Sequence, residues 1–558
     1  MNIPVGTSNF TKIRQEGFYY IDKSGLIEEL LGTSGIEITL IVRPRRFGKT
    51  LGMRMLAEFF DIRKDSRALF EGLAVSKNQE LCKEWMNGYP VLFLTFKDVG
   101  GNTFDSAFGM LKTAFMNACI EHAYLLDNDS IDEDDKRKFA QLKSMTADVE
   151  VVKSAISLLI RMMYIHYGKP VVLLLDEYDV PIAKASGSRG KKMDYYDEMM
   201  EVVRPLISMA IKDNDLLKFA VITGCLRIAK ESIFTGANNF VSDTIADSRL
   251  NEYFGFTQAE IDGLLQAAEL TDHAKEMKKW YDGYHFGSFD VYCPWDVMNH
   301  VNSLILNPDT PPKNYWENTS DNAIIRSFLD RTQFDIQEKF ETLLAGGYIT
   351  EKIENALTYD VLEASEENLW TLLYFTGYLT IAEVEEKTDS GRTALRIPNA
   401  EIMDIFRKSV RKWFWDRAAA SDRSELFSAF WNADTDKLAQ LITDLLFNTI
   451  SYHDYRESYY HAFTVGLLSN AGYKVESNYE CGLGRSDIVV KDRRNRRALV
   501  IEIKWTDSES SLEKACESAL RQVESKQYAK SVEQAGYRTV IRLAMAFWKK
   551  QCLVRRCV

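Results

Sequence analysis

Residues 38–50 limit the possible folds of this chain more than any other stretch. An apolar run, Ile38–Val42, breaks at Pro44 into a basic turn that ends in Gly48-Lys49-Thr50. An amphipathic segment follows over residues 51–60. Strand, turn, Gly-Lys-Thr and helix in this order predict a phosphate-binding loop, because backbone N–H groups at a helix start attract an anion.

Two side chains of this loop have predictable roles. Lys49 is placed to reach the terminal phosphates of a nucleotide, and the hydroxyl of Thr50 can bind Mg²⁺. Arg43 stands where the usual pattern has its first glycine. Gly-Lys-Thr alone is a weak signal, so the interpretation depends on the rest of the chain.

Three further apolar runs have the length of strands: residues 91–96, 171–175 and 219–223. Helical patterns separate them. Strands that alternate with helices predict an α/β fold with a parallel sheet covered by helices on both faces. In such a sheet the ligand binds at the C-terminal ends of the strands.

Two of these runs end in polar residues that could take part in metal binding or catalysis. Asp176 and Glu177 follow the second run directly, and unpaired carboxylates are costly at the end of a buried strand. We expect Asp176 to hold Mg²⁺ together with Thr50, and Glu177 to polarise the attacking water. The alternative is a loop start that happens to be acidic.

The third run ends in Thr223, which could sense the γ-phosphate or orient water. Arg227 follows it, as a phosphate contact or as an ordinary surface arginine, and Asn238 and Asn239 could face the same cleft.

The pattern becomes helical from about residue 256. A dense aromatic and glycine stretch at residues 280–287 indicates packing at loop corners, with a lid or partner surface as the alternative. A β-hairpin is expected around residues 386–391. We therefore divide the chain into a core at 1–255, a helical extension at 256–345, a helical connecting module with the hairpin at 346–448, and a C-terminal domain at 449–558.

The C-terminal domain contains a second candidate site. Two apolar runs on either side of a basic turn predict a β-hairpin. Centring it on Arg494 pairs Asp487 with Ile501, so Asp487 lies beside Glu502 within one residue of register. Glu502 and Lys504 are two residues apart and share a face of their strand.

Two carboxylates and a lysine at one end of an apolar hairpin suit metal-dependent cleavage of a phosphodiester. Asp487 and Glu502 would bind Mg²⁺, which activates water and stabilises the leaving oxygen. Lys504 would orient the nucleophile or offset developing charge, and Glu457 could complete the metal shell. The alternative is a salt-bridged edge hairpin in which Lys504 simply pairs with Glu502.

Charge is unevenly distributed along the chain. The net charge is −12, yet residues 485–558 carry 17 Lys and Arg against 9 Asp and Glu. A basic module on an acidic body favours a polyanionic partner, with a solvated basic turn at residues 491–497 as the alternative. We expect nucleic acid, with DNA preferred.

The same composition predicts a cytoplasmic protein without a membrane partner. No apolar run reaches the about 18 residues of a membrane span. The N-terminus has no basic region followed by an apolar stretch, which argues against a signal peptide. The eight cysteines are scattered without paired Cys-x-x-Cys spacing, as expected for reduced thiols.

These features together resemble the bacterial predicted AAA-ATPase-like proteins fused to a C-terminal PD-(D/E)XK nuclease-superfamily domain. The similar motifs are Tyr20-Ile21-Asp22-Lys23-Ser24, the loop from Arg43 to Thr50, Leu175-Asp176-Glu177-Tyr178, Thr223-Gly224 with Arg227, Trp280-Tyr281-Asp282-Gly283-Tyr284, Tyr459-Tyr460-His461, Gly484-Arg485-Ser486-Asp487 and Glu502-Ile503-Lys504.

The resemblance implies a P-loop ATPase core with a helical extension, a restriction-endonuclease-like C-terminal fold, and ATP and Mg²⁺ as cofactors. It also implies that Arg43 is the expected residue in place of the first glycine. We expect the whole loop to contribute to nucleotide binding through Arg43, Arg45, Arg46, Phe47, Gly48, Lys49 and Thr50.

Three functions follow as hypotheses. The leading one is an ATP-regulated nuclease, because Asp487, Glu502 and Lys504 are all present. The second is a signalling or scaffold ATPase whose nuclease-like domain binds without cutting. The third is a nucleotide-dependent remodeller of protein assemblies, in which the helical middle region contacts a protein partner or a second copy of the chain.

Overall fold

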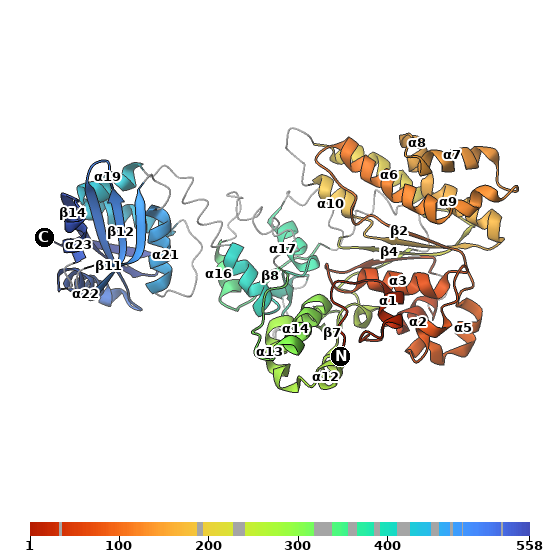
Figure 1. Cartoon of the computed structure of the whole chain (residues 1–558), viewed down its shortest axis with the longest axis horizontal. Helices are drawn as coiled ribbons and strands as arrows, with labels where there is room; N and C mark the ends of the chain where they lie inside the picture. The colour runs from red at the N-terminus through yellow and green to blue at the C-terminus, as the bar shows by residue number, and fades with distance from the viewer. Residues whose placement is uncertain are drawn as a thin grey trace. The chain divides into compact units, whose positions relative to one another are not determined.

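The computed structural model describes residues 1–32, 36–186, 194–226, 240–316, 337–354, 365–383, 391–409, 424–447, 457–468, 473–481, 484–525 and 528–557. The chain forms two compact units (Figure 1). Unit 1 comprises residues 1–320 and 350–402, and unit 2 comprises residues 321–349 and 403–558. The boundaries at 255, 345 and 448 stay predictions.

Unit 1 is built on a five-stranded sheet in the order β2-β3-β4-β1-β5. All neighbouring strands are parallel. The strands are β1 (Ile38–Val42), β2 (Val91–Thr95), β3 (Val171–Asp176), β4 (Leu217–Gly224) and β5 (Phe240–Asp243). Every residue of β1 and β3 is buried, as in a sheet covered on both faces. The predicted α/β fold is confirmed.

Helices cover both faces of this sheet, as Figure 1 shows. One group lies beside α3, which starts in the phosphate loop, and the other beside α6. The first group is α1 (Phe10–Gln15), α2 (Gly25–Gly32), α3 (Lys49–Phe60) and α5 (Gln79–Trp85). The second is α6 (Phe104–Glu121), α7 (Glu133–Lys143), α8 (Val149–Lys153), α9 (Ala155–Tyr167) and α10 (Val180–Ser186). Helix α11 (Tyr196–Ile211) packs on α9 and α10.

The rest of unit 1 is mainly helical with short strands. Its helices are α12 (Gln258–Ala267), α13 (Ala274–Tyr281), α14 (Pro294–Leu306) and α17 (Glu366–Phe375). Strands β6 (Tyr284–Phe286) and β7 (Phe289–Val291) pair with each other. Strands β8 (Ile349–Glu351), β9 (Thr380–Ile381) and β10 (Thr393–Arg396) form a sheet in the order β8-β10-β9. Strands β9 and β10 pair antiparallel, as expected for the predicted hairpin, whose turn lies outside the described residues. Thr257 and Glu260 form the capping box at the start of α12.

Unit 2 contains a mixed sheet in the order β11-β12-β13-β14-β15. Its strands are β11 (Lys474–Cys481), β12 (Gly484–Asp492), β13 (Arg497–Trp505), β14 (Thr539–Trp548) and β15 (Gln551–Arg556). One face packs on α19 (Ser424–Asn432), α20 (Thr435–Phe447) and α21 (Glu457–Leu468). The other packs on α22 (Leu512–Ser525) and α23 (Tyr528–Gln534). Helix α16 (Gln337–Leu344) also belongs to this unit.

The predicted hairpin is β12 and β13, and its register differs from the prediction by one residue. Ile488 pairs with Ile501 and Asp492 with Arg497. Continuing this ladder places Asp487 opposite Glu502, not opposite Ile501. The turn is therefore centred between Arg494 and Asn495, and the two acids lie closer than the predicted pairing required.

No helix among the described residues is both long and apolar enough to cross a membrane.

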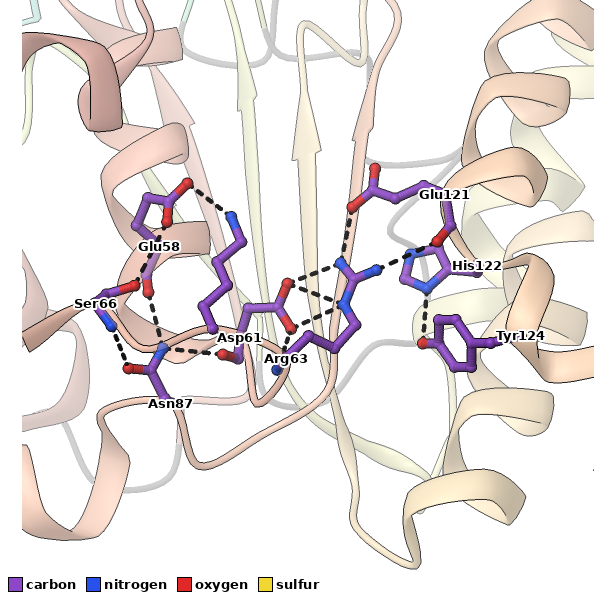
Figure 2. A network of polar contacts seen from close by, with 9 residues as sticks. Glu58, Asp61, Arg63, Ser66, Asn87, Glu121, His122 and Tyr124 are labelled. Atoms are coloured by element: carbon purple, nitrogen blue, oxygen red, sulfur yellow. Dashed lines mark hydrogen bonds and ion pairs between the residues drawn. The ribbon is translucent and has the colours of Figure 1, made fainter.

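A polar network joins the far ends of α3 and α6 (Figure 2). Asp61 is buried and accepts hydrogen bonds from the backbone N–H, Nε and a terminal nitrogen of Arg63. The same terminal nitrogen of Arg63 lies 2.8 Å from Oε1 of Glu121 at the end of α6. Asn87 donates to the carbonyls of Glu58 and Asp61. The network therefore fastens helices from both faces at the end of the sheet away from the phosphate loop.

We predict that Arg63→Met destabilises unit 1 by about 2–4 kcal/mol, because it leaves the buried Asp61 carboxylate without its cation. Arg137→Met is the matched control, since its partner Asp134 is exposed on the surface of α7 and such pairs contribute about 0–1 kcal/mol. Chemical denaturation followed by tryptophan fluorescence would measure both. Equal effects of the two variants would contradict the structural role of the network.

Candidate functional site

The phosphate loop joins β1 to α3 with two left-handed residues. Arg46 has φ 72° and Gly48 has φ 83°. Lys49 is 5% exposed, and its ammonium donates to the carbonyls of Arg43 and Pro44, each at 2.8 Å. The amine that would reach a phosphate is thus held beneath its own loop, and a bound phosphate would compete with these carbonyls for it.

Asp176 is the centre of the candidate nucleotide site. This carboxylate, fully buried at the end of β3, accepts hydrogen bonds from the hydroxyls of Thr50 at 2.9 Å and Thr223 at 2.6 Å. Thr95, at the end of β2, lies 3.4 Å from the same carboxylate. The structure therefore brings together Thr50, Asp176 and Thr223, an all-oxygen set of the kind that Mg²⁺ prefers.

Thr95 was not among the predicted site residues. Thr95 could have been identified by the same pattern as Thr223, because each carries a hydroxyl near the C-terminal end of an apolar, strand-length run.

Glu177 lies beside this cluster in a left-handed backbone conformation, with φ 53°. Its N–H donates to the hydroxyl of Thr223 at 3.3 Å. Burial raises the pKa of Glu177, and the nearby Lys49 opposes that rise. A carboxylate with a raised pKa next to the phosphate loop is suited to accept a proton from water.

Asp179 and Gly224 support this arrangement. Asp179 accepts from the backbone N–H groups of Cys225 and Leu226, each at 2.9 Å, which fixes the turn after β4. A Cβ on Gly224 would lie 2.6 Å from the ring of Tyr178, so this turn requires glycine.

The arginines of the loop point in different directions. The buried guanidinium of Arg43 donates to the carbonyls of Val42, Asp243 and Arg249 and to the side chain of Asn251. Its contacts are those of a structural residue that joins β1 to the segment after β5. Arg45 is exposed, and its charge opposes a small part of the rise that burial causes in the pKa of Glu177. Arg227, Asn238 and Asn239 lie outside the described residues.

Phe47 and Arg46 pack on the aromatic stretch of the middle region. The ring of Phe47 lies 4.9 Å from that of Tyr284, 5.0 Å from Phe286 and 6.4 Å from Trp316, measured between centroids. Arg46 lies over the ring of Trp295 and donates to the carbonyl of Tyr315 at 3.0 Å. The aromatic residues at 284–316 thus form a seat for the phosphate loop, which we call the loop seat.

Two buried acids lie under the loop seat. Glu401 accepts from the backbone N–H groups of Tyr315 and Trp316 at 2.5 and 2.9 Å. Its carboxyl is also hydrogen-bonded to that of Asp296, which the thiol of Cys293 contacts as well. Two carboxyl groups can bond only through a shared proton. Burial raises the pKa of both acids, and the charge of Asp296 raises that of Glu401 further, so the pair shares one proton.

The second candidate site lies on β12 and β13 in unit 2. Asp487 accepts from the backbone N–H of Ile503 at 2.8 Å. Glu502 is 1% exposed, and its Oε1 lies 3.4 Å from the ammonium of Lys504. Its other oxygen, Oε2, is buried and has no hydrogen-bond partner among the described residues. Burial, followed by the charge of Asp487, raises the pKa of Glu502 to about 7, and Lys504 opposes the rise.

This second site fits a divalent cation. The unpartnered oxygen of Glu502 and the facing Asp487 are hard oxygen ligands that a cation would satisfy. Within the described residues no group of three or more His, Cys, Asp or Glu side chains could hold a metal, so a third protein ligand would have to come from outside that set. Glu457 begins α21, and its side chain lies outside the described residues.

Helix α21 contributes one contact that the prediction did not assign. His461 Nε2 lies 2.9 Å from the backbone carbonyl of Asp487, which it can reach as a donor. His461 therefore positions the strand that carries Asp487. Its place in the Tyr459-Tyr460-His461 motif was the one indication of His461 in the sequence analysis.

Comparison with known proteins assigns two parts of the chain to families. Residues 4–234 match the family described as "Predicted AAA-ATPase", and residues 455–556 match the PD-(D/E)XK nuclease superfamily. The chain thus combines an AAA-ATPase-like domain with a C-terminal PD-(D/E)XK superfamily domain. It is 28% identical over 503 residues to a protein of Azotobacter chroococcum mcd 1, described as "Uncharacterized protein in vnfD 5'region". That match covers 88% of this chain and 86% of the other.

We predict that Glu401→Gln keeps the fold and removes part of its sensitivity to alkaline pH. The folded-state pKa of Glu401 is raised, so its stabilising contribution is full below the unfolded value and is lost as pH rises through the folded value. Glutamine imitates the protonated acid, because its amide can donate to Asp296 permanently. The free energy of unfolding of Glu401→Gln should therefore fall less than that of the wild type between acidic and alkaline pH.

The matched comparison is Glu401→Ala, which leaves the two backbone N–H groups without their acceptor and removes one partner of Asp296. This variant should be destabilised at every pH. Identical pH profiles for the wild type and Glu401→Gln would rule out a shared proton.

Proposed function

We propose that this protein binds and hydrolyses ATP in unit 1, and that its C-terminal domain cuts a phosphodiester bond of nucleic acid with Mg²⁺. The observation that carries the proposal is the convergence of Asp487, Glu502 and Lys504, in which one buried oxygen of Glu502 has no partner within the described part of the chain. A structural ion pair alone would leave that oxygen unsatisfied, whereas a metal ligand needs it free.

In the ATPase half, each residue has a distinct task. Lys49 leaves the loop carbonyls and binds the terminal phosphates, while Thr50 and Asp176 would hold Mg²⁺. The ion, when bound, neutralises charge on the phosphates. Glu177 accepts a proton from the attacking water, and Thr223 orients that water from the adjacent strand. Backbone N–H groups around Gly48 complete the phosphate cradle.

In the nuclease half, Asp487 and Glu502 would hold Mg²⁺, with Glu457 as the proposed further ligand. When bound there, the ion would lower the pKa of a water molecule and offset charge on the leaving oxygen. Glu502 must lose its proton to become a ligand, which its partner Lys504 favours. Lys504 donates to a phosphate oxygen as negative charge develops. The proposed substrate is DNA, and the proposed location of the protein is the cytoplasm.

The loop seat supports a second candidate, an ATP-dependent remodeller of protein assemblies. Arg46 and Phe47 join the phosphate loop to the aromatic residues of the middle region. A change in the loop on nucleotide binding would therefore reach that region directly. In this alternative, as in that of a signalling or scaffold ATPase, the C-terminal domain binds without cutting, and the middle region contacts a protein partner or another copy of the chain.

For the ATPase, we predict that Glu177→Gln lowers the rate of ATP hydrolysis about 10²–10⁴-fold, the usual contribution of a general base. ATP binding should persist in this variant, because the substitution removes no phosphate contact. Lys49→Ala should lose binding as well as hydrolysis. Asp487→Ala is the control and should hydrolyse ATP like the wild type. Undiminished hydrolysis in Glu177→Gln would refute the assignment.

For the nuclease, we predict Mg²⁺-dependent cleavage of labelled DNA or RNA that EDTA abolishes and added Mg²⁺ restores. Asp487→Asn and Lys504→Ala should each lower the cleavage rate at least about 10²-fold, because each removes part of the charge stabilisation in the transition state. Lys530→Ala, an exposed lysine on α23, is the matched control and should cut normally.

Cleavage measured in Lys49→Ala then separates the hypotheses. If that variant still cuts, ATP is regulatory or dispensable. If the wild type cuts neither DNA nor RNA while it hydrolyses ATP, the nuclease proposal fails and the scaffold and remodeller alternatives remain.

A further inference from the structure

A pocket with aromatic walls lies in unit 2, apart from the acid site. Its volume is about 420 Å³. The residues that matter here are Phe427, Trp431 and Asn432 from α19, Tyr473 at the start of β11, and Arg497 at the start of β13. We call this the α19 pocket.

The α19 pocket lies on the other face of the sheet from Glu502. Leu499, Ile501 and Ile503 pack with α19, α20 and α21, and Arg497 shares their face because side chains alternate along a strand. Glu502 and Lys504 alternate to the opposite face. Arg497 and Lys504 are also separated by about 23 Å along β13. The pocket is therefore a separate site.

The walls of the pocket are three rings and one guanidinium. The Tyr473 ring lies 5.4 Å from that of Trp431 and 5.1 Å from that of Phe427, between centroids. The guanidinium of Arg497 lies 4.2 Å from the centroid of Trp431. Asp492 fixes this guanidinium by accepting a 2.8 Å hydrogen bond from its Nε. A planar ligand would meet preformed π-faces and a preformed cation, so little side-chain entropy would be lost on binding.

A further observation indicates the chemistry of the ligand. Three exposed arginines, Arg493, Arg494 and Arg496, occupy the turn next to Arg497. The site thus offers π-faces and a cluster of positive charge. A planar base with an attached phosphate matches both.

We propose that the α19 pocket binds one unpaired nucleotide of a nucleic-acid strand. The base lies against Trp431 and Tyr473, and its phosphate lies beside Arg497 and the arginine turn. The proposal rests on the proposed function only in that the partner is a nucleic acid. It adds that this partner has an unpaired segment, held at a distance from the bond that is cut.

The test is the affinity of the full chain for fluorescent single strands of about 12 nucleotides, a length within the range that such sites cover. Binding is measured in EDTA, so that no strand is cut, with deoxyribose and ribose strands in separate arms to identify the sugar. Trp431→Leu should weaken binding of the preferred strand about 5- to 150-fold, the equivalent of losing one base–aromatic stack. Trp431→Phe keeps a ring and should recover most of the affinity.

Trp85→Leu is the matched control, because Trp85 in unit 1 also carries a cation, Lys218, at 4.9 Å from its ring. The Trp85→Leu protein should bind the single strand with the affinity of the wild type. If Trp431→Leu does not fold, as judged by circular dichroism, Arg497→Lys replaces it. That variant keeps the charge but loses the planar stack, and should weaken binding about 2- to 5-fold.

Unchanged affinity in a folded Trp431→Leu protein would overturn the proposal. So would an equal loss of affinity for a duplex of the same sequence, since a paired base cannot enter the pocket, and so would absence of binding to either kind of strand. Because these measurements need no metal, they are independent of cleavage. A failed nuclease leaves the pocket testable, and a failed pocket leaves the effect of Asp487→Asn on cleavage intact.

Discussion

The carboxylate of Asp176 is the interaction on which the nucleotide half of the molecule depends. A buried carboxylate is costly unless donors surround it, and here hydroxyls from three other elements converge on it. Thr50 belongs to the helix that starts in the phosphate loop, while Thr95 and Thr223 end the two flanking strands. The charge of one side chain therefore sets the relative positions of β2, β3, β4 and α3. A metal ion and a nucleotide would meet a site already assembled.

Carboxylates also lie at the centre of the candidate site in the C-terminal domain, but their surroundings differ from those of Asp176. Asp487 and Glu502 face each other across a hairpin, and two acids at this distance oppose each other's ionisation. Lys504 offsets only part of that repulsion, so the pKa of Glu502 stays raised. Asp176 is satisfied by neutral donors, whereas Glu502 keeps one oxygen without a partner among the described residues. The first arrangement is stable by itself, and the second gains most from a cation.

Much of the fold and of the two candidate sites could be predicted from the sequence, because the patterns that indicate them lie within short stretches of the chain. Apolar runs marked four of the five strands of the parallel sheet, and the polar residues at their tips marked Asp176 and Thr223. The hairpin register came within one residue because a turn of known length constrains it. Strand β5 was missed because Phe240–Asp243 has only four residues and two of them are polar.

The remaining differences between the prediction and the structure come from contacts between residues far apart in the sequence. No local pattern shows that the guanidinium of Arg43 turns toward residues 243–251, or that Phe47 packs about 240 positions away along the chain. Both side chains belong to a motif whose positions suggested phosphate contact. Only the folded chain shows that these two side chains hold the loop in place.

The loop seat has a consequence for how this protein can be divided. The match to the ATPase family ends at residue 234, which invites the view that the N-terminal portion is an autonomous enzyme. Phe47 is fully buried, and much of its cover comes from Tyr284, Phe286 and Trp316. A fragment ending before these residues would expose an aromatic ring in the middle of its phosphate loop. The packing of the phosphate loop therefore depends on residues as far along the chain as Trp316, and the part of the chain that folds around the loop is longer than the family match.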